Sequence, residues 1–151
     1  PAFDRVAVIG WANEPMILGD TDVATLQAGL IPSGYLPTPR EPMRALFYWP
    51  DVPQSLIDAD EAHASMTPAT LGRAALTPGI VHEASAQLAV PIQIVQSVMD
   101  TSPAPQNEVA YFKASPDIEV QILPEAAHCQ NFASTRVQHW ATLNDWIDRT
   151  N

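Results

Sequence analysis

The sequence of 151 residues has little cysteine and few basic side chains. Its single cysteine excludes an intrachain disulfide framework, and this weakly favours a reducing compartment such as the cytoplasm. Only 7 lysines and arginines stand against 17 acidic residues, which argues against nucleic acid or an anionic membrane as the main partner. The chain also lacks any run near the roughly 20 apolar residues of a spanning helix, so we expect no membrane span.

What is present is the composition of a globular protein, 46% hydrophobic and 16% charged, with the length of one domain. Three segments differ in character. Residues 1–14 contain an apolar run typical of a buried parallel core strand. Residues 15–88 are rich in proline, which excludes long regular elements and favours a lid or cap insertion. Residues 89–151 are regular and complete the core. A buried strand so near the first residue predicts a truncated or processed amino end.

The last of these segments predicts a strand, a helix, a strand and a helix, in that order. Their expected ranges are 90–96, 106–114, 118–123 and 134–148. Such alternation is typical of parallel strands joined by right-handed crossovers. The last helix has an amphipathic pattern, typical of a helix that packs on a core; its stripe consists of Val137, Trp140, Leu143, Asn144 and Ile147. Earlier in the chain, Thr67 and Pro68 are expected to cap and begin a short helix.

An acid and a histidine follow the two strand-like runs. Asp100 comes after the run 90–96, and His128 comes after the run 118–123. Because ligands of an open parallel sheet bind beyond the carboxyl ends of its strands, both side chains should meet in one crevice. A carboxylate there can hold an imidazole in one tautomer, and the histidine can then act as general base and general acid. Either residue alone would be interpreted as structural, but together they predict a catalytic pair.

Several features between residues 89 and 147 fall in a characteristic order. They are Val90-Pro91 at the start of a strand, Asp100 beyond it, Leu123-Pro124 before His128, and Trp146-Ile147 in the last helix. This order resembles the carboxy-terminal part of the α/β-hydrolase superfamily, although Ser97 and Ala127 stand where that family usually has glycine. Residues 1–88 are similar, less closely, to the preceding core strand and the lid insertion of the same family.

The resemblance implies an α/β fold, namely the carboxy-terminal half of an α/β-hydrolase, with parallel strands, flanking helices and a helical lid insertion. It implies Asp100 as the triad acid and His128 as the triad base. The nucleophile turn of the family, G-x-S-x-G, is absent from this sequence. The serine is therefore expected on a separate amino-terminal half, as in a split or processed chain. The implied enzyme is an esterase, lactonase or acyltransferase that is complete only with that partner half.

Apolar residues of the first segment and the lid are candidates for the substrate pocket, because such pockets are mostly apolar. The predicted substrate-binding residues are Trp11, Tyr48, Trp49 and Met66. They favour a small hydrophobic substrate with an ester, thioester or lactone bond. No cofactor is expected. The four histidines lack paired metal-ligand spacing, so no metal site is expected either.

Other hypotheses stay open at this point. A relative with an aspartate nucleophile, of the epoxide hydrolase or dehalogenase type, would use the same histidine. A non-catalytic relative would bind a small ligand. The turn after the first strand could also be a nucleophile turn with Ala12 in place of serine, although Pro15 fits poorly with the helix that should follow. Cys129 is expected to be a buried or rim thiol.

Overall fold

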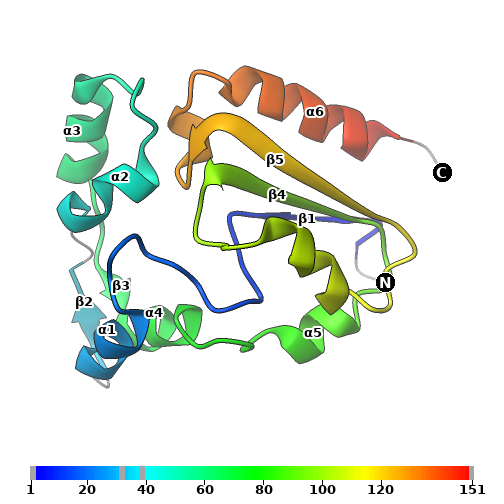
Figure 1. Ribbon diagram of the computed structural model, residues 1–151, viewed down its shortest axis with the longest axis horizontal. Coiled ribbons are helices and arrows are strands. Elements are labelled where there is room, and N and C mark those ends of the chain that lie inside the picture. The colour runs from blue at the N-terminus through cyan, green and yellow to red at the C-terminus, as the bar shows by residue number, and fades with distance from the viewer. Residues whose placement is uncertain (1–2, 31–32, 38–39, 150–151) are drawn as a thin grey trace.

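Three parallel strands form the central sheet of the protein. The computed structural model describes residues 3–30, 33–37 and 40–149. Within these ranges the order of the strands is β1 (Val6–Ile9), β4 (Ile92–Met99) and β5 (Ile118–Ala127), and both pairings are parallel (Figure 1). The mixed α/β class, with a parallel sheet flanked by helices, is therefore confirmed.

The middle strand, β4, is the most deeply buried. Its first six residues, 92–97, are all buried, as expected for a parallel strand that is covered on both faces. Strand β1 pairs with it from Val6 opposite Ile92 to Ile9 opposite Val95. Because all three strands run in the same direction, their carboxyl ends meet at one edge of the sheet, where a site can form.

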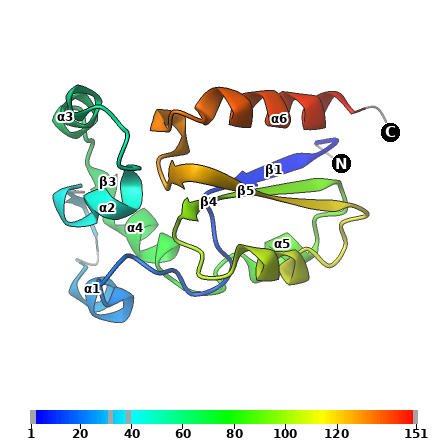
Figure 2. The ribbon, with the colours of Figure 1, turned by 45° about the horizontal axis from the view of Figure 1, so that its top comes forward.

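Helices cover both faces of the sheet (Figure 2). Helix α6 (Arg136–Asp148) lies on one face, and the 3-10 helix η2 (Pro105–Tyr111) lies with helix α5 (His82–Ala86) on the other. Within the described residues, no helix combines the length and the apolar character that crossing a membrane requires. The sheet is thus the middle layer of three, and its two faces bury separate apolar clusters.

The side chains of β4 alternate between these two clusters because successive residues of a strand point to opposite faces. Ile92 and Ile94 pack with Phe112 on the side of η2. Val95 packs with Leu123 and two alanines in the second cluster. Each cluster excludes water from one face of the sheet, and burial of each large aliphatic side chain stabilises the fold by about 1.5 to 3 kcal/mol.

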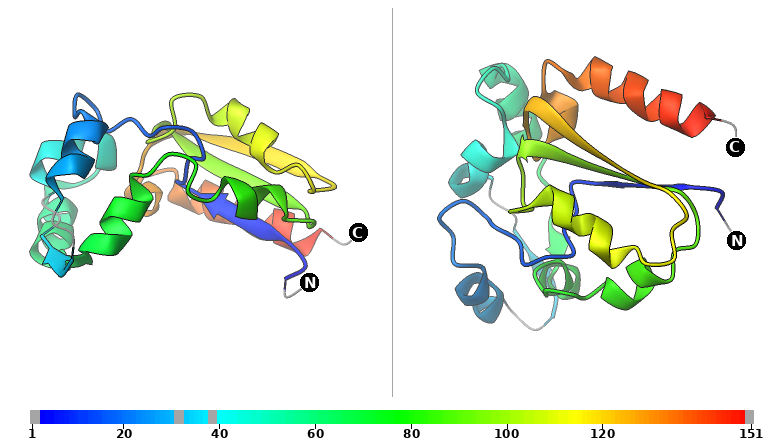
Figure 3. Two further views of the ribbon diagram at one scale, coloured as in Figure 1. Left: turned by 90° about the horizontal axis from the view of Figure 1, so that it is seen from below. Right: turned by 45° about the vertical axis from the view of Figure 1, so that its right-hand side comes forward.

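The long segment between β1 and β4 lies mainly beyond the carboxyl ends of the strands (Figures 1 and 3). Its elements are α1 (Val23–Gly29), β2 (Tyr35–Leu36), η1 (Glu41–Met43), α2 (Arg44–Phe47), α3 (Gln54–Ala62), β3 (Thr67–Pro68) and α4 (Ala69–Ala75), followed by α5. Strands β2 and β3 pair antiparallel as a separate small sheet. Frequent prolines keep the elements short because proline cannot donate the hydrogen bond that a helix interior needs.

Two predicted helices are present but differ from the prediction in detail. The helix expected at 106–114 is the shorter 3-10 helix η2. The helix expected after Thr67 is present as α4, but Thr67 and Pro68 pair with β2, and Pro68 rather than Thr67 is the N-cap of the helix. In the second case the partner strand lies about thirty residues earlier in the chain, so a local pattern could not indicate it. Pairing with a distant segment therefore moved the helix start by one residue, from Pro68 to Ala69.

The last helix packs with a different side from the one that the sequence predicted. Three members of the expected stripe, Val137, Trp140 and Ile147, are 62%, 43% and 48% exposed. The buried side carries His139 and Trp146 instead, which lie two helical turns apart and therefore share a face. The expected stripe is interrupted by a polar residue, whereas the adjacent side, about 100° around the helix, carries the large indole of Trp146. The helix is oriented by burial of that indole.

Two tryptophans of α6 provide a matched test of this orientation. We expect Trp146→Ala, at a residue that is 2% exposed, to lower the free energy of unfolding by about 3 to 5 kcal/mol because it leaves a cavity. Trp140→Ala, at a residue that is 43% exposed, should cost about 1 kcal/mol or less. Urea denaturation measures both values. Equal losses, or a larger loss for Trp140→Ala, would mean that the predicted stripe is the packed face.

Candidate functional site

Asp100 lies directly after β4, and its side chain accepts hydrogen bonds from backbone groups of the same turn. Its Oδ2 accepts a hydrogen bond from the backbone N–H of Ser97 at 2.9 Å, and its Oδ1 accepts one from the backbone N–H of Thr101 at 2.8 Å. A short aspartate side chain can bond nearby backbone groups in this way. The carboxylate thus ends the strand, and its side chain is 0% exposed.

A β-bulge brings His128 to the same edge of the sheet. The pairs on either side of the bulge are Ser97 with Leu123 and Met99 with Ala127. Two steps along β4 therefore correspond to four along β5, and Glu125 within the bulge has a left-handed φ of 50°. Bulges bend a strand and redirect the side chains that follow. As a result β5 continues past its predicted end at residue 123 and places His128 beside Asp100.

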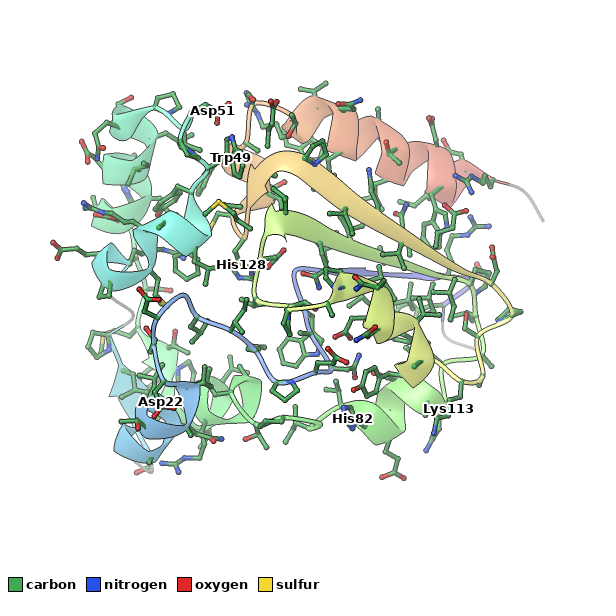
Figure 4. The ribbon with its side chains drawn as sticks, in the orientation of Figure 1. Asp22, Trp49, Asp51, His82, Lys113 and His128 are labelled. Atoms are coloured by element: carbon green, nitrogen blue, oxygen red, sulfur yellow. The ribbon has the colours of Figure 1, made fainter. Side chains whose placement is uncertain are left out.

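The imidazole of His128 is hydrogen-bonded to the carboxylate of Asp100. Nδ1 and Oδ1 are 2.7 Å apart, and the side chain of His128 is 30% exposed. Because an ionised carboxylate only accepts hydrogen bonds, the proton of the neutral imidazole is assigned to Nδ1. Nε2 then carries a lone pair, and no group among the described residues hydrogen-bonds to it. This is the tautomer that a general base needs. Figure 4 shows His128 between the sheet and the lid helices.

The surroundings of Asp100 favour its charged form. Burial by itself would raise the pKa of the carboxyl group. Hydrogen bonds from His128 and from the backbone N–H groups of Ser97 and Thr101 outweigh burial, and they hold the pKa below its ordinary value of 3.8. An ionised carboxylate in contact with the imidazole can stabilise the imidazolium that forms when His128 takes up a proton.

Two residues pack directly against the imidazole of His128. Gly10, at the end of β1, has a φ of +63°, and a Cβ built on it would lie 3.3 Å from His128 Cε1. The close approach therefore requires glycine. The ring of Phe47 stacks on the imidazole, with centroids 5.4 Å apart and planes inclined by 29°. Neither residue is among the substrate-binding residues that the sequence predicted, because only the tertiary structure brings them to His128.

The segment between β1 and β4, which the sequence predicts to be a lid and which keeps that name here, is joined by backbone hydrogen bonds to the residues that follow β5. The N–H of His128 donates to the carbonyl of Leu46 at 3.0 Å, and the N–H of Cys129 donates to the carbonyl of Phe47 at 2.9 Å. Helix α2 is thus attached directly to the segment that carries the candidate base. A displacement of this helix would move the backbone of His128, so the lid and the site are mechanically linked.

Side-chain contacts fix the outer part of the lid. The Arg40 guanidinium lies over the ring of Phe47, 4.9 Å from its centroid, and pairs with Asp60 at 2.9 Å. Tyr48, one of the predicted substrate-binding residues, is buried and donates its hydroxyl to Asp60 at 2.5 Å. Burial and this hydrogen bond raise the pKa of Tyr48 well above its usual range. The hydroxyl of Tyr48 therefore binds within the lid in this structure.

The other predicted substrate-binding residues lie in different surroundings. Trp11 directly follows Gly10 and is partly buried, and its indole N–H has no partner among the described residues. Trp49 lies apart from His128 in Figure 4, and Met66 is 52% exposed. Two of the predicted residues are thus adjacent in the chain to a residue packed on His128, namely Trp11 beside Gly10 and Tyr48 beside Phe47.

The alternative positions for a nucleophile do not fit the structure. Burial raises the pKa of Cys129 to about 11, which disfavours the reactive thiolate. A nucleophile turn at Ala12 would need a helix directly after β1, but residues 11–17 are irregular and the next helix begins at Val23. Among the described residues, no group of three histidine, cysteine or acidic side chains is arranged to hold a metal ion.

A second buried polar cluster fixes the loop that follows β1. Glu108 of η2 is 1% exposed, and its Oε2 accepts hydrogen bonds from the backbone and side chain of Asn13 at 2.8 and 3.0 Å. Its Oε1 accepts one from the N–H of Glu14 at 3.2 Å. Ser85 donates to Asn13 Oδ1 at 3.1 Å, and His82 Nε2 lies 2.8 Å from the Asn13 carbonyl oxygen. Because both buried oxygens of Glu108 accept hydrogen bonds, the free-energy cost of burying the carboxylate is offset. The cluster therefore holds the loop after β1 in place.

In comparisons with known proteins, no family model matches this chain, and no curated protein matches it either. The functional argument therefore depends on the geometry of the site.

A pair of glycine variants tests the contact with the imidazole. Gly10→Ala and Gly19→Ala both place a Cβ at a positive φ, +63° and +58°, so each should cost about 1 to 2 kcal/mol of stability. Only Gly10→Ala should also change the NMR signals of the His128 ring, because nothing lies within 4 Å of a Cβ at Gly19. Unchanged ring signals in Gly10→Ala would contradict the close approach.

The lowered pKa of Asp100 predicts how stability depends on pH. A carboxyl whose pKa is lower in the folded than in the unfolded state stabilises the fold above the unfolded value of about 3.9, and this contribution is lost as the pH falls through the folded value. We therefore expect Asp100→Asn to reduce the loss of unfolding free energy below about pH 4. Urea denaturation between pH 3 and pH 7, compared with the unchanged protein, measures it. Identical slopes would contradict the stabilising role of the ionised carboxylate.

Proposed function

We propose that this chain carries the acid and the base of a serine-type α/β-hydrolase. The supporting observation is the 2.7 Å hydrogen bond between Asp100 Oδ1 and His128 Nδ1, formed at the carboxyl ends of adjacent parallel strands. Acid first and histidine second is also the chain order of the last two members of that triad. A purely structural pair gives no reason for a partly exposed imidazole whose Nε2 has no partner among the described residues.

In the proposed reaction the residues of this chain move and stabilise one proton. His128 Nε2 accepts the proton of a serine hydroxyl as the serine oxygen forms a bond to the substrate carbonyl carbon. Asp100 keeps Nδ1–H in place and stabilises the imidazolium. When the tetrahedral intermediate collapses, His128 returns the proton to the leaving oxygen or sulfur. Water, or another acceptor in acyl transfer, then repeats the cycle on the acyl-enzyme.

The serine belongs, in this proposal, to a separate amino-terminal half. The free edge of β1 offers a place where its strands could continue the sheet. The N–H groups of Val6 and Gly10 bond to the β4 side, so those of the alternate residues Ala7 and Ile9 point the other way. Among the described residues no strand pairs with this outer edge. A parallel strand there would place its carboxyl end near Gly10 and His128.

The proposed substrate is an ester, thioester or lactone with a small hydrophobic acyl group. Phe47 stacks on the imidazole from the lid side, and Trp11 follows the glycine that packs on it. Apolar walls next to the base favour an apolar acyl group and exclude water from the reacting atoms. The net charge of −10 disfavours strongly anionic substrates through long-range repulsion.

Labelling with a fluorophosphonate probe tests this function. The protein is isolated from its source cells, and the masses of its subunits are measured under native and denaturing conditions. We expect a second polypeptide, bound natively, to become covalently labelled on a serine with loss of fluoride. His128→Ala in this chain should slow labelling at least about 1,000-fold. The exposed His63, whose Nδ1 lies 2.7 Å from the carbonyl oxygen of Ala59, provides the control, because His63→Ala should not change the rate.

Each other outcome counts against the proposal. A single unlabelled species, with no partner that carries the serine, would leave the triad incomplete and favour a ligand-binding role. Turnover of an epoxide or a haloalkane without labelling would replace serine by aspartate as nucleophile. Labelling that is unaffected by His128→Ala would exclude His128 as the base.

A further inference from the structure

Gln130 is the second side chain that contacts Asp100. It begins the 3-10 helix η3 (Gln130–Phe132), two residues after His128, and is 4% exposed. Its Nε2 donates to Asp100 Oδ2 at 3.2 Å, and the amide must point this way because an ionised carboxylate can only accept. His128 and Gln130 therefore reach Asp100 from a single turn, and each bonds a different oxygen of the carboxylate.

Four hydrogen bonds hold the carboxylate of Asp100, two on each oxygen. The N–H of Ser97 shares Oδ2 with Gln130, and the N–H of Thr101 shares Oδ1 with His128. The final torsion of an aspartate side chain has a broad, roughly two-fold energy minimum. Without the bond from Gln130, Oδ2 would be held by the N–H of Ser97 alone, and the less restrained carboxylate would tilt about this torsion and weaken the bond between Oδ1 and the imidazole.

The surroundings of Gln130 indicate that its amide N–H group, which donates to Asp100, is the part of the side chain that acts in the site. Its Oε1 is buried and has no partner among the described residues, which costs stability. A methionine of similar shape would avoid that cost. The backbone of Gln130 bonds to the carbonyl of His128 and to the N–H of Ala133, as any residue could. The bond to Asp100 is the contribution that an apolar residue could not make.

We propose that Gln130 is a positioning residue that holds Asp100 Oδ2 so that Oδ1 stays directed at His128 Nδ1. The catalytic meaning of this inference rests on the proposed function. The hydrogen bond itself is measured on the chain without any reaction, so the two can fail separately.

The ionisable groups near Asp100 are few. His128 and Cys129 face it from the end of β5, and Arg40 and Asp60 of the lid act on Cys129. Of these groups, among the described residues, His128 is the one that hydrogen-bonds to the carboxylate. The backbone N–H groups of Ser97 and Thr101 also bond to the carboxylate, and they are present in every variant of residue 130, so a difference in the titration of Asp100 reports on the contacts of residues 128–130.

Two variants of similar shape separate positioning from space filling. Gln130→Met keeps the volume and removes the donor, whereas in Gln130→Glu the new carboxyl is buried beside an ionised one, is therefore protonated, and can donate its O–H to Asp100 in place of the amide. The readout is the NMR resonance of the Nδ1 proton of His128, which lies far downfield when the proton is bonded to a carboxylate. We expect most of its intensity to be lost in Gln130→Met and retained in Gln130→Glu, while the urea midpoint of Gln130→Met stays at or above that of the unchanged protein.

A resonance of full intensity in Gln130→Met would overturn the inference and reduce Gln130 to a space-filling residue. The unchanged protein gives a second test that does not depend on a variant folding. The side-chain amide signals of Gln130 should shift with the same midpoint as the carboxyl carbon of Asp100 when the pH is lowered. Gln27, whose amide donates to the carbonyl of Arg73 and the hydroxyl of Thr77, is the control. A Gln130 amide that ignores this titration also overturns the inference.

Kinetics in the assembled enzyme keep the two proposals distinguishable. We expect Gln130→Met to lower kcat at least about tenfold with little change in KM, because a misaligned base affects the reacting atoms and not substrate binding. If His128→Ala is fully active, the proposed function fails while the NMR result for Gln130 stands. If His128→Ala is inactive and Gln130→Met keeps both its kcat and its downfield resonance, only the inference about Gln130 fails.

Discussion

The arrangement at the carboxyl edge of the sheet depends on one buried carboxylate. Asp100 has no exposed side-chain surface, so both of its oxygens must be satisfied within the protein. Meeting that demand requires the turn after β4 and the turn after β5 to approach each other, because each supplies donors to it. The bulge in β5 follows from the same demand, since it gives the strand the extra length with which His128 reaches Asp100.

The turn after β5, which carries His128, also binds helix α2 of the lid. Backbone N–H groups of His128 and Cys129 are bonded to carbonyls of the lid helix α2, and Phe47 from that helix stacks on the imidazole. One short segment therefore carries the candidate base, orients the acid and holds the apolar cover. The elements of the segment between β1 and β4 are short, and they can therefore follow an irregular edge that a long helix could not.

Polar groups buried on the opposite side complete the support of the site. Glu108 satisfies the backbone of Asn13 and Glu14 and thereby fixes the loop that leaves β1 next to Gly10. Gly10 in turn allows the imidazole to pack against the backbone without a clash. Three strands thus contribute to the position of His128: β5 precedes His128 itself, β4 precedes Asp100, and β1 precedes Gly10. In this respect the sheet acts as a rigid frame for the proposed catalytic pair.

The sequence by itself determined the mixed α/β class, the approximate positions of β4, β5 and α6, and the pairing of Asp100 with His128, because hydrophobic period and strand-end position are local properties of the chain. Whether that pair is catalytic stays a prediction. Only the tertiary structure decided the packed face of α6, the strand role of Thr67 and Pro68, and the residues around the imidazole. Gly10, Phe47 and Gln130 reach the site through backbone pairing, lid packing and a turn, and each depends on contacts between distant segments that no local pattern encodes.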